Sequence, residues 1–156
     1  MPKLGENEVY RCIKAVDLAP VLGSLGGLQW TRAGQTGKYP CDVVIKKALP
    51  REIMALIEGL DLGGTLARAV LRRLAPRQDI PPHVDDWMPA EADWRRFQVP
   101  LVTHPDVVMR WPDDGVSVHL EPGFLYEVRY DRTHEVVHGA DCERIHLQID
   151  QVNATI

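Results

Sequence analysis

The chain has 156 residues, 45% of them hydrophobic, which is enough to form a single domain with a substantial core. Its net charge of -4 leaves no basic excess of the kind that favours nucleic-acid binding. No run reaches the roughly 18 apolar residues that cross a bilayer, and the first residues lack the apolar segment of a secretory signal. We therefore expect a cytoplasmic domain spanning residues 1–156 that binds neither membranes nor nucleic acid.

The cysteines give a further indication of compartment. Cys12, Cys41 and Cys142 are odd in number, far apart and in no CxxC or related metal-binding spacing. A disulfide framework is therefore not expected, and the thiols are predicted to be reduced, as is usual inside cells.

The first 65 residues are expected to supply helix and loops that support the core. Residues 23–27 and 31–39 have the glycine-rich and polar composition of loops, flanking a short strand around residues 28–31. The clearest helix spans Pro50 to Leu60, where apolar side chains recur at helical spacing. Proline suits the first turn of this helix, and two glycines follow its end.

The character changes to β structure from about residue 66 onward. Turn signals at 112–115 (PDDG) and 121–123 (EPG) separate short β-branched or alternating runs. Residues 66–74 fit either a helix or a strand. Short strands at this spacing favour a sandwich, jelly roll or barrel. The expected strands lie at residues 107–111, 116–120, 124–130 and 144–150.

Candidate metal ligands lie in the tripeptide His83-Val84-Asp85. In an extended backbone, side chains two residues apart point to the same side, so His83 and Asp85 can reach one ion. His134 is the candidate third ligand. Two histidines and one carboxylate on one face of an ion leave open positions, as in non-haem iron(II) oxygenases, although zinc accepts the same ligands.

A final strand carries the candidate anion-binding residue. Residues 144–150 alternate polar and apolar side chains, which predicts a half-buried strand with a polar inner face. Arg144 begins this strand, and its planar guanidinium can pair with a carboxylate through two hydrogen bonds.

The order of these features resembles the 2-oxoglutarate-dependent oxygenases: an HxD pair, a distal histidine and an arginine ten residues after it. More narrowly, the chain resembles the aspartyl/asparaginyl β-hydroxylase family over residues 66–150. The segments that carry this resemblance are Arg72 to Asp85 (RRLAPRQDIPPHVD), Arg96 to Leu101 (RFQVPL), Leu120 to Gly123 (LEPG) and His134 to Asp150, which ends in RIHLQID.

The resemblance implies a mainly β fold with flanking helices, a double-stranded β-helix or jelly roll whose core is residues 66–150. It also implies roles for individual residues. Iron(II) would be held by His83, Asp85 and His134, and 2-oxoglutarate by Arg144 at its distal carboxylate, with Arg96 near the carboxylate beside the iron. Gln98 stands where the family often has a histidine, and Arg72 is a further candidate for the cosubstrate site, unless it belongs to a solvated basic edge with Arg68 and Arg73.

The activity implied is hydroxylation by dioxygen of a free amino acid or of an Asp/Asn-type side chain in a peptide, with 2-oxoglutarate converted to succinate. The sequence leaves two alternatives open. One is a jelly-roll metal- and carboxylate-binding or sensor protein without catalysis; the other is a zinc-dependent hydrolase or isomerase on a similar barrel. One further departure from the family is His138, which replaces an asparagine often found after the distal histidine.

Overall fold

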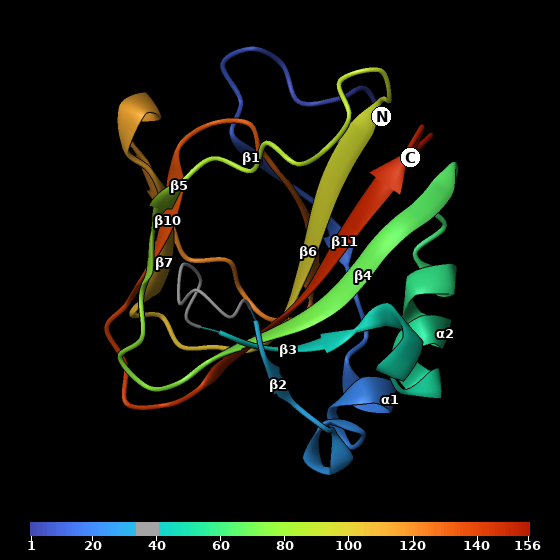
Figure 1. Cartoon of the computed structure of the whole chain (residues 1–156), viewed down its shortest axis with the longest axis vertical. Helices are drawn as coiled ribbons and strands as arrows, with labels where there is room; N and C mark the ends of the chain where they lie inside the picture. Colours follow the sequence, from blue (N-terminus) through green and yellow to red (C-terminus); the bar gives the residue numbers. More distant parts are fainter. Residues whose placement is uncertain (34–40) are drawn as a thin grey trace.

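The computed structural model of the chain describes residues 1–33 and 41–156 and contains two antiparallel β-sheets (Figure 1). Most of the loop expected at 31–39 therefore lies outside the described residues. The larger sheet has the order β1-β9-β6-β11-β4-β3-β2, and the smaller one β5-β10-β7-β8. The strands are β1 (Tyr10–Ala15), β2 (Thr31–Arg32), β3 (Asp42–Ile45), β4 (Thr65–Leu74), β5 (Ile80–His83), β6 (Trp94–Val102), β7 (Val107–Trp111), β8 (Val116–Val118), β9 (Phe124–Val128), β10 (His134–His138) and β11 (Arg144–Val152).

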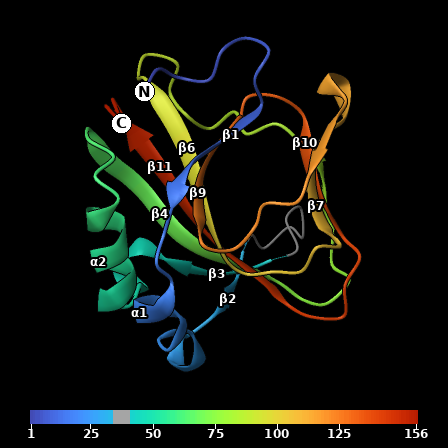
Figure 2. The ribbon, with the colours of Figure 1, turned by 180° about the vertical axis from the view of Figure 1, so that it is seen from behind.

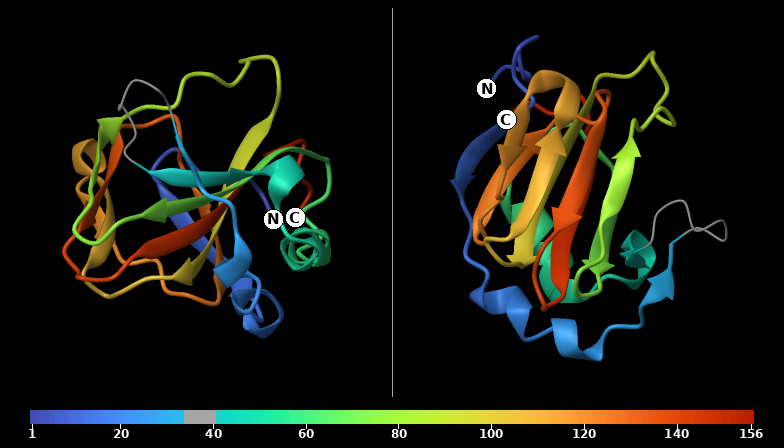
Figure 3. Two further views of the ribbon diagram at one scale, coloured as in Figure 1. Left: turned by 60° about the horizontal axis from the view of Figure 1, so that its bottom comes forward. Right: turned by 90° about the vertical axis from the view of Figure 1, so that its left-hand side faces the viewer.

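The path from β4 to β11 has the connectivity of a jelly roll. Successive strands alternate between the sheets, except that β7 and β8 are neighbours in the smaller one. β11 therefore lies between β4 and β6, although it is last in the chain, and β10 lies between β5 and β7. The views in Figure 3 show the two sheets facing each other. This two-sheet, mainly β arrangement with few helices confirms the expected fold class.

Helices cover the outer face of the larger sheet. α1 (Ala19–Leu22) and α2 (Arg51–Gly59) lie on the side of β4 and β11 that faces away from the smaller sheet, as Figure 2 shows from behind. From α2, Ile53 and Ile57 pack into a cluster with apolar side chains of the sheet, including the fully buried Leu71 and Leu147. Short 3-10 turns occur at Leu25–Gly27, Lys46–Ala48 and Pro112–Asp114. No helix in the described residues is long and apolar enough to cross a membrane.

On the face of the larger sheet that points toward the smaller sheet, the side chains of β11 are polar. On β11, Ile145, Leu147 and Ile149 belong to the core under the helices. The residues between them necessarily point toward the smaller sheet, because side chains alternate along a strand. The polar inner face predicted for residues 144–150 is therefore present. The strand is not half-buried as predicted, because all of these residues are buried.

Several local predictions are confirmed, and the strand pairing resolves the segment that the sequence left ambiguous. The helix is present at Arg51–Gly59, and the ambiguous segment 66–74 is strand β4, which pairs with both β11 and β3. The expected PDDG and EPG turns are formed, with Gly115 and Gly123 at φ of 67° and 80°. The first 65 residues contain more strand than expected: the structure adds β1 and β3, and the short strand falls at Thr31–Arg32 instead of residues 28–31.

Candidate metal centre

The three predicted ligands converge between the sheets. β5 ends at His83, β10 begins at His134, and these two residues are direct partners across the antiparallel pair. Asp85 follows β5, where its backbone N–H donates to the carbonyl of Tyr130 at 3.0 Å. The strand pairing thus joins residues 51 positions apart in the sequence.

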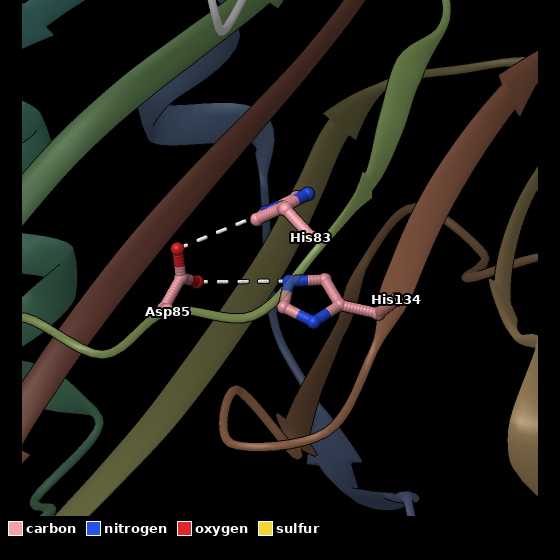
Figure 4. A group of neighbouring side chains, drawn as sticks. All are labelled: His83, Asp85 and His134. Atoms are coloured by element: carbon pink, nitrogen blue, oxygen red, sulfur yellow. Dashed lines mark ion pairs between the residues drawn. The ribbon is translucent and has the colours of Figure 1, made fainter.

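The geometry suits a single ion. His83 Nε2 lies 3.7 Å from Asp85 Oδ1, and His134 Nε2 lies 3.6 Å from Asp85 Oδ2. One ligand atom from each residue falls within 4.8 Å of the other two, and Figure 4 shows the three side chains directed toward one another. A metal ion between them could bind two imidazoles and one carboxylate.

Hydrogen bonds determine which nitrogen of each ring carries the proton. His83 Nδ1 lies 2.8 Å from the carbonyl oxygen of Pro81, and His134 Nδ1 lies 2.7 Å from that of Arg132. A carbonyl oxygen can only accept, so each Nδ1 carries the hydrogen and each neutral ring has its lone pair on Nε2. Metal-binding histidines are commonly oriented by such a bond to the backbone.

The ionisation states also favour a cation. Burial lowers the pKa of His134 to about 4, so this ring is neutral at pH 7. For Asp85, burial alone would raise the pKa, but the charge of Arg96 and the hydrogen bond that it donates lower the pKa below the usual value. The centre therefore offers the neutral imidazole of His134 and the carboxylate of Asp85 at neutral pH.

Arg96 connects the candidate ligand to a second carboxylate. Its Nη1 donates to Asp85 Oδ2, while Nε and Nη2 form a bidentate pair with Asp150 at 2.7 and 3.1 Å. Arg96 is 4% exposed and Asp150 is fully buried. Burial opposes the charge of Arg96, but these two carboxylates raise its pKa. Asp150 thereby holds Arg96, which in turn orients Asp85.

A cavity of about 60 Å³ extends from this centre between the sheets. Nine of its twelve lining residues have polar or charged side chains, and they include the three candidate ligands. Arg72 spans part of it, with Nε donating to Gln148 Oε1 at 3.2 Å and Nη1 lying 3.4 Å from the sulfur of Cys41. The lining residues are Arg72, Ile80, His83, Asp85, Arg96, Gln98, Met109, His134, Val136, Arg144, His146 and Gln148.

Arg144 is at the other end of the row of inward-facing residues on β11, six positions from Asp150. It is 3% exposed, and its Nη2 donates to His146 Nδ1 at 2.8 Å. Its Nε has no hydrogen-bond partner in the described part of the chain, and no ion pair joins it to a described carboxylate. Burial, and next the charge of Arg72, lower the pKa of Arg144 to about 9. This end of the cavity therefore favours an anion.

His146 supplies a second donor there. Because Arg144 can only donate, His146 Nδ1 is an acceptor and Nε2 carries the hydrogen; this buried Nε2 also lacks a partner among the described residues. The atom 2.8 Å from the same Nδ1 is Gln98 Oε1. Because this oxygen can only accept, an acceptor Nδ1 requires the amide to be turned so that its NH₂ faces the ring. Burial and then Arg144 hold the pKa of His146 well below 6.5, which keeps the ring neutral.

Each site residue predicted from the sequence lines this one cavity. Two further lining residues, His146 and Gln148, were not assigned a role there, and neither was Asp150, which holds Arg96. The alternating pattern of the last strand placed all three on the correct face. The other histidines lie elsewhere: His104 is exposed, and His119 bonds the carbonyl of Val107 at 2.9 Å. The cysteines are unpaired, in agreement with the sequence.

No family model and no curated protein matches the chain. Solved structures do. A 2OG-Fe(II) oxygenase family oxidoreductase from Burkholderia pseudomallei is similar with a TM-score of 0.67 and 13% identity, over 91% of this chain and 85% of that one. A prolyl-4-hydroxylase from Pseudomonas putida gives 0.55 and 19%, over 79% and 76%. A predicted oxalate decarboxylase from Thermotoga maritima gives 0.51 and 12%, over 81% and 95%.

At these identities the likenesses define the fold alone, a double-stranded β-helix. Proteins with different names share this architecture, so function must be argued from the site. The chain is thus a jelly-roll protein with a His-Asp-His group that could hold a metal ion.

Proposed function

We propose that this protein is an iron(II)- and 2-oxoglutarate-dependent dioxygenase that hydroxylates an amino acid or an Asp/Asn-type side chain of a peptide. The observation that carries the proposal is a single cavity with two kinds of site. A His-Asp-His group lies at the metal end, and a buried guanidinium without a carboxylate partner in the described residues lies at the other end.

The metal end fits iron(II). His83 and His134 would bind through Nε2 and Asp85 through a carboxylate oxygen, which leaves positions for other ligands of an octahedral ion. When bound, iron(II) and 2-oxoglutarate supply the oxidative chemistry, in which dioxygen is consumed, 2-oxoglutarate becomes succinate and carbon dioxide, and the substrate gains a hydroxyl group. Arg96 contributes by holding Asp85 in place.

The deep end fits the distal carboxylate of 2-oxoglutarate. Arg144 Nε and His146 Nε2 are buried donors without described partners, and an anion there would accept from both. Leaving such donors unpaired costs free energy, which a carboxylate ligand recovers. Arg72 and Gln98, on the same wall, place further donors along the ligand.

The test is succinate formation. Purified protein is supplied anaerobically with iron(II) and 2-oxoglutarate and is then exposed to oxygen, with and without a pool of amino acids. Succinate that increases with the pool, and is lost in His134→Ala, supports the dioxygenase. If neither iron(II) nor 2-oxoglutarate binds, the proposal is wrong. Binding of both without turnover by any amino acid or Asp/Asn peptide would favour the non-catalytic binding protein instead.

A further inference from the structure

A second hollow adjoins the metal centre at its outer side. This groove of about 370 Å³ shares Asp85 and Arg72 with the cavity, and Arg32, Arg68 and Trp87 form much of the rest of its wall. Nothing in the metal centre or the 2-oxoglutarate site uses Arg68 or Trp87. The groove is therefore a separate feature beside the reacting centre.

Arg68 faces this groove from the inner side of the larger sheet. It is on β4 directly opposite Asp150, whereas Leu74, at the far end of β4, is opposite Arg144. Asp150 pairs with Arg96, which contacts the candidate ligand Asp85. Arg68 thus lies level with the metal centre, about 20 Å along the strands from the position of Arg144, taking about 3.3 Å per residue.

The charge of Arg68 is not matched by a close carboxylate. No hydrogen bond or ion pair joins it to another described residue, and the segment outside the described residues, 34–40, contains no Asp or Glu. Asp85 and Asp150 form their ion pairs with Arg96, and they act on Arg68 only at longer range. Burial, and next the charge of Arg72, lower the pKa of Arg68. A half-buried guanidinium in this setting favours an incoming anion.

Other charged groups of the groove are already engaged or exposed. Arg32 lies 3.7 Å from Asp42, and Arg72 donates to Gln148. Asp86 is exposed to solvent. Trp87 is 46% exposed, and the guanidinium of Arg68 lies 5.1 Å from the centre of its ring. The indole ring therefore packs against one face of the guanidinium through a cation–π contact. It also provides an apolar surface for a ligand that binds beside Arg68.

We propose that Arg68 binds a carboxylate of the substrate, with Trp87 as the adjoining wall, so that the substrate is an amino acid or peptide side chain that carries a carboxylate. This inference rests on the proposed function, since it deals with the substrate of the same metal centre. It adds a direction: the substrate reaches the metal from the groove, on the side away from Arg144.

The test measures binding without turnover. Protein with manganese(II) and 2-oxoglutarate, kept anaerobic, is titrated calorimetrically with three sets of ligands: free L-amino acids, their C-terminal carboxamides, and N-acetyl-L-aspartic acid α-amide. The first set offers an α-carboxylate, the second lacks it, and the third offers only a side-chain carboxylate. The first and third sets thus distinguish the two sources of the carboxylate.

The variants are Arg68→Gln, Arg68→Lys and, as a matched control, Arg51→Gln, which removes a solvated arginine from α2. The expected result is that at least one carboxylate ligand binds and that Arg68→Gln weakens its Kd about 10- to 100-fold, the usual effect of losing a charge-assisted hydrogen bond. Arg68→Lys retains part of the affinity and Arg51→Gln is unchanged. If the ligand is a free amino acid, its C-terminal carboxamide binds the wild type as weakly as the acid binds Arg68→Gln.

The proposal is overturned if no carboxylate ligand binds, if Arg68→Gln binds it as tightly as the wild type, or if the neutral amide binds equally well. Thermal unfolding confirms that each variant is folded. The affinity for 2-oxoglutarate, measured in the same samples, separates the two proposals: normal 2-oxoglutarate binding with no effect of Arg68→Gln removes only the role of Arg68. Absent 2-oxoglutarate binding removes the proposed function, whatever the carboxylate titration gives.

Discussion

Each end of the cavity contains a buried arginine, but the two arginines differ in whether a carboxylate pairs with them. At the metal end, Arg96 is bound by both Asp85 and Asp150. At the deep end, Arg144 is as deeply buried, but its one hydrogen bond to a described residue is to the neutral ring of His146. Among the residues that the structure describes, Arg96 thus has carboxylate partners and Arg144 has none.

The difference separates a structural role from a binding role. A buried charge with its partners fixes geometry, whereas a buried charge without them destabilises the protein until a ligand arrives. We therefore predict that Arg96 is needed for the stability of the fold and that Arg144 is needed to bind a ligand. Four variants test this contrast.

The largest effect is expected from removing a candidate metal ligand. His134→Ala should weaken iron(II) binding by more than about 100-fold, exceeding the loss typical of outer partners of a metal site. Metal content after gel filtration measures this. His104→Ala, at an exposed position, is the control and should retain the metal. Normal metal content in His134→Ala would contradict the assignment.

The next effect tests the satisfied end. Asp150→Asn removes the charge that pairs with buried Arg96 and should lower the free energy of unfolding by about 3 kcal/mol. The same change at Asp141, whose pair with Arg77 is exposed and screened by solvent, should have a much smaller effect on the free energy of unfolding. Denaturant unfolding of the two variants gives the comparison. Equal costs would show that the Arg96 pair does not act as a buried structural pair.

The unsatisfied end should respond in the opposite way. Arg144→Met removes a buried charge that lacks a carboxylate partner in the described residues, so the ligand-free protein should be at least as stable as the wild type. The same variant should raise the 2-oxoglutarate concentration needed for half-maximal succinate formation by about 10- to 100-fold. A variant that unfolds readily while its cosubstrate requirement stays unchanged would assign Arg144 to structure.

The smallest effect is a pH dependence. The pKa of His146 lies well below 6.5 in the folded protein, because of burial and then Arg144. As the pH falls through about 6.5, the imidazole takes up a proton in the unfolded chain but not in the folded one, so stability decreases as the pH is lowered. His146→Gln should make the unfolding free energy depend less steeply on pH below 6.5. An unchanged slope would mean that other groups cause the dependence.

The local sequence pattern was sufficient to predict features that depend on residues close together in the sequence. The HxD pair and the alternation of residues 144–150 predicted which side chains share a face. The short strands and turns predicted a sandwich, jelly roll or barrel, and the family resemblance implied the double-stranded β-helix. β6 (Trp94–Val102) was not predicted as a strand, because buried Arg95, Arg96 and Gln98 remove the apolar pattern that marks a central strand. These polar residues are buried because their partners come from β9 and β11.

The partners of the arginines could not be predicted from the sequence either, because they lie on other strands. Asp150 lies 54 residues from Arg96, and only the adjacency of β6 and β11 brings them together. The sequence pattern cannot distinguish the satisfied Arg96 from the unsatisfied Arg144, since both are arginines on inward-facing positions. The distinction requires the long-range pairing of strands.

The most direct test of the central claim is whether one ligand needs both ends of the cavity. The Kd of 2-oxoglutarate for manganese(II)-loaded protein is compared with that of 2-oxobutyrate, which lacks the distal carboxylate, and of glutarate, which lacks the keto oxygen, in the wild type and in Arg144→Met. We expect 2-oxoglutarate to bind the wild type at least about 10-fold more tightly than either analogue, and its advantage over 2-oxobutyrate to disappear in Arg144→Met. Equal affinities of the wild type for 2-oxoglutarate and 2-oxobutyrate would contradict the account, because the deep end would then bind no carboxylate.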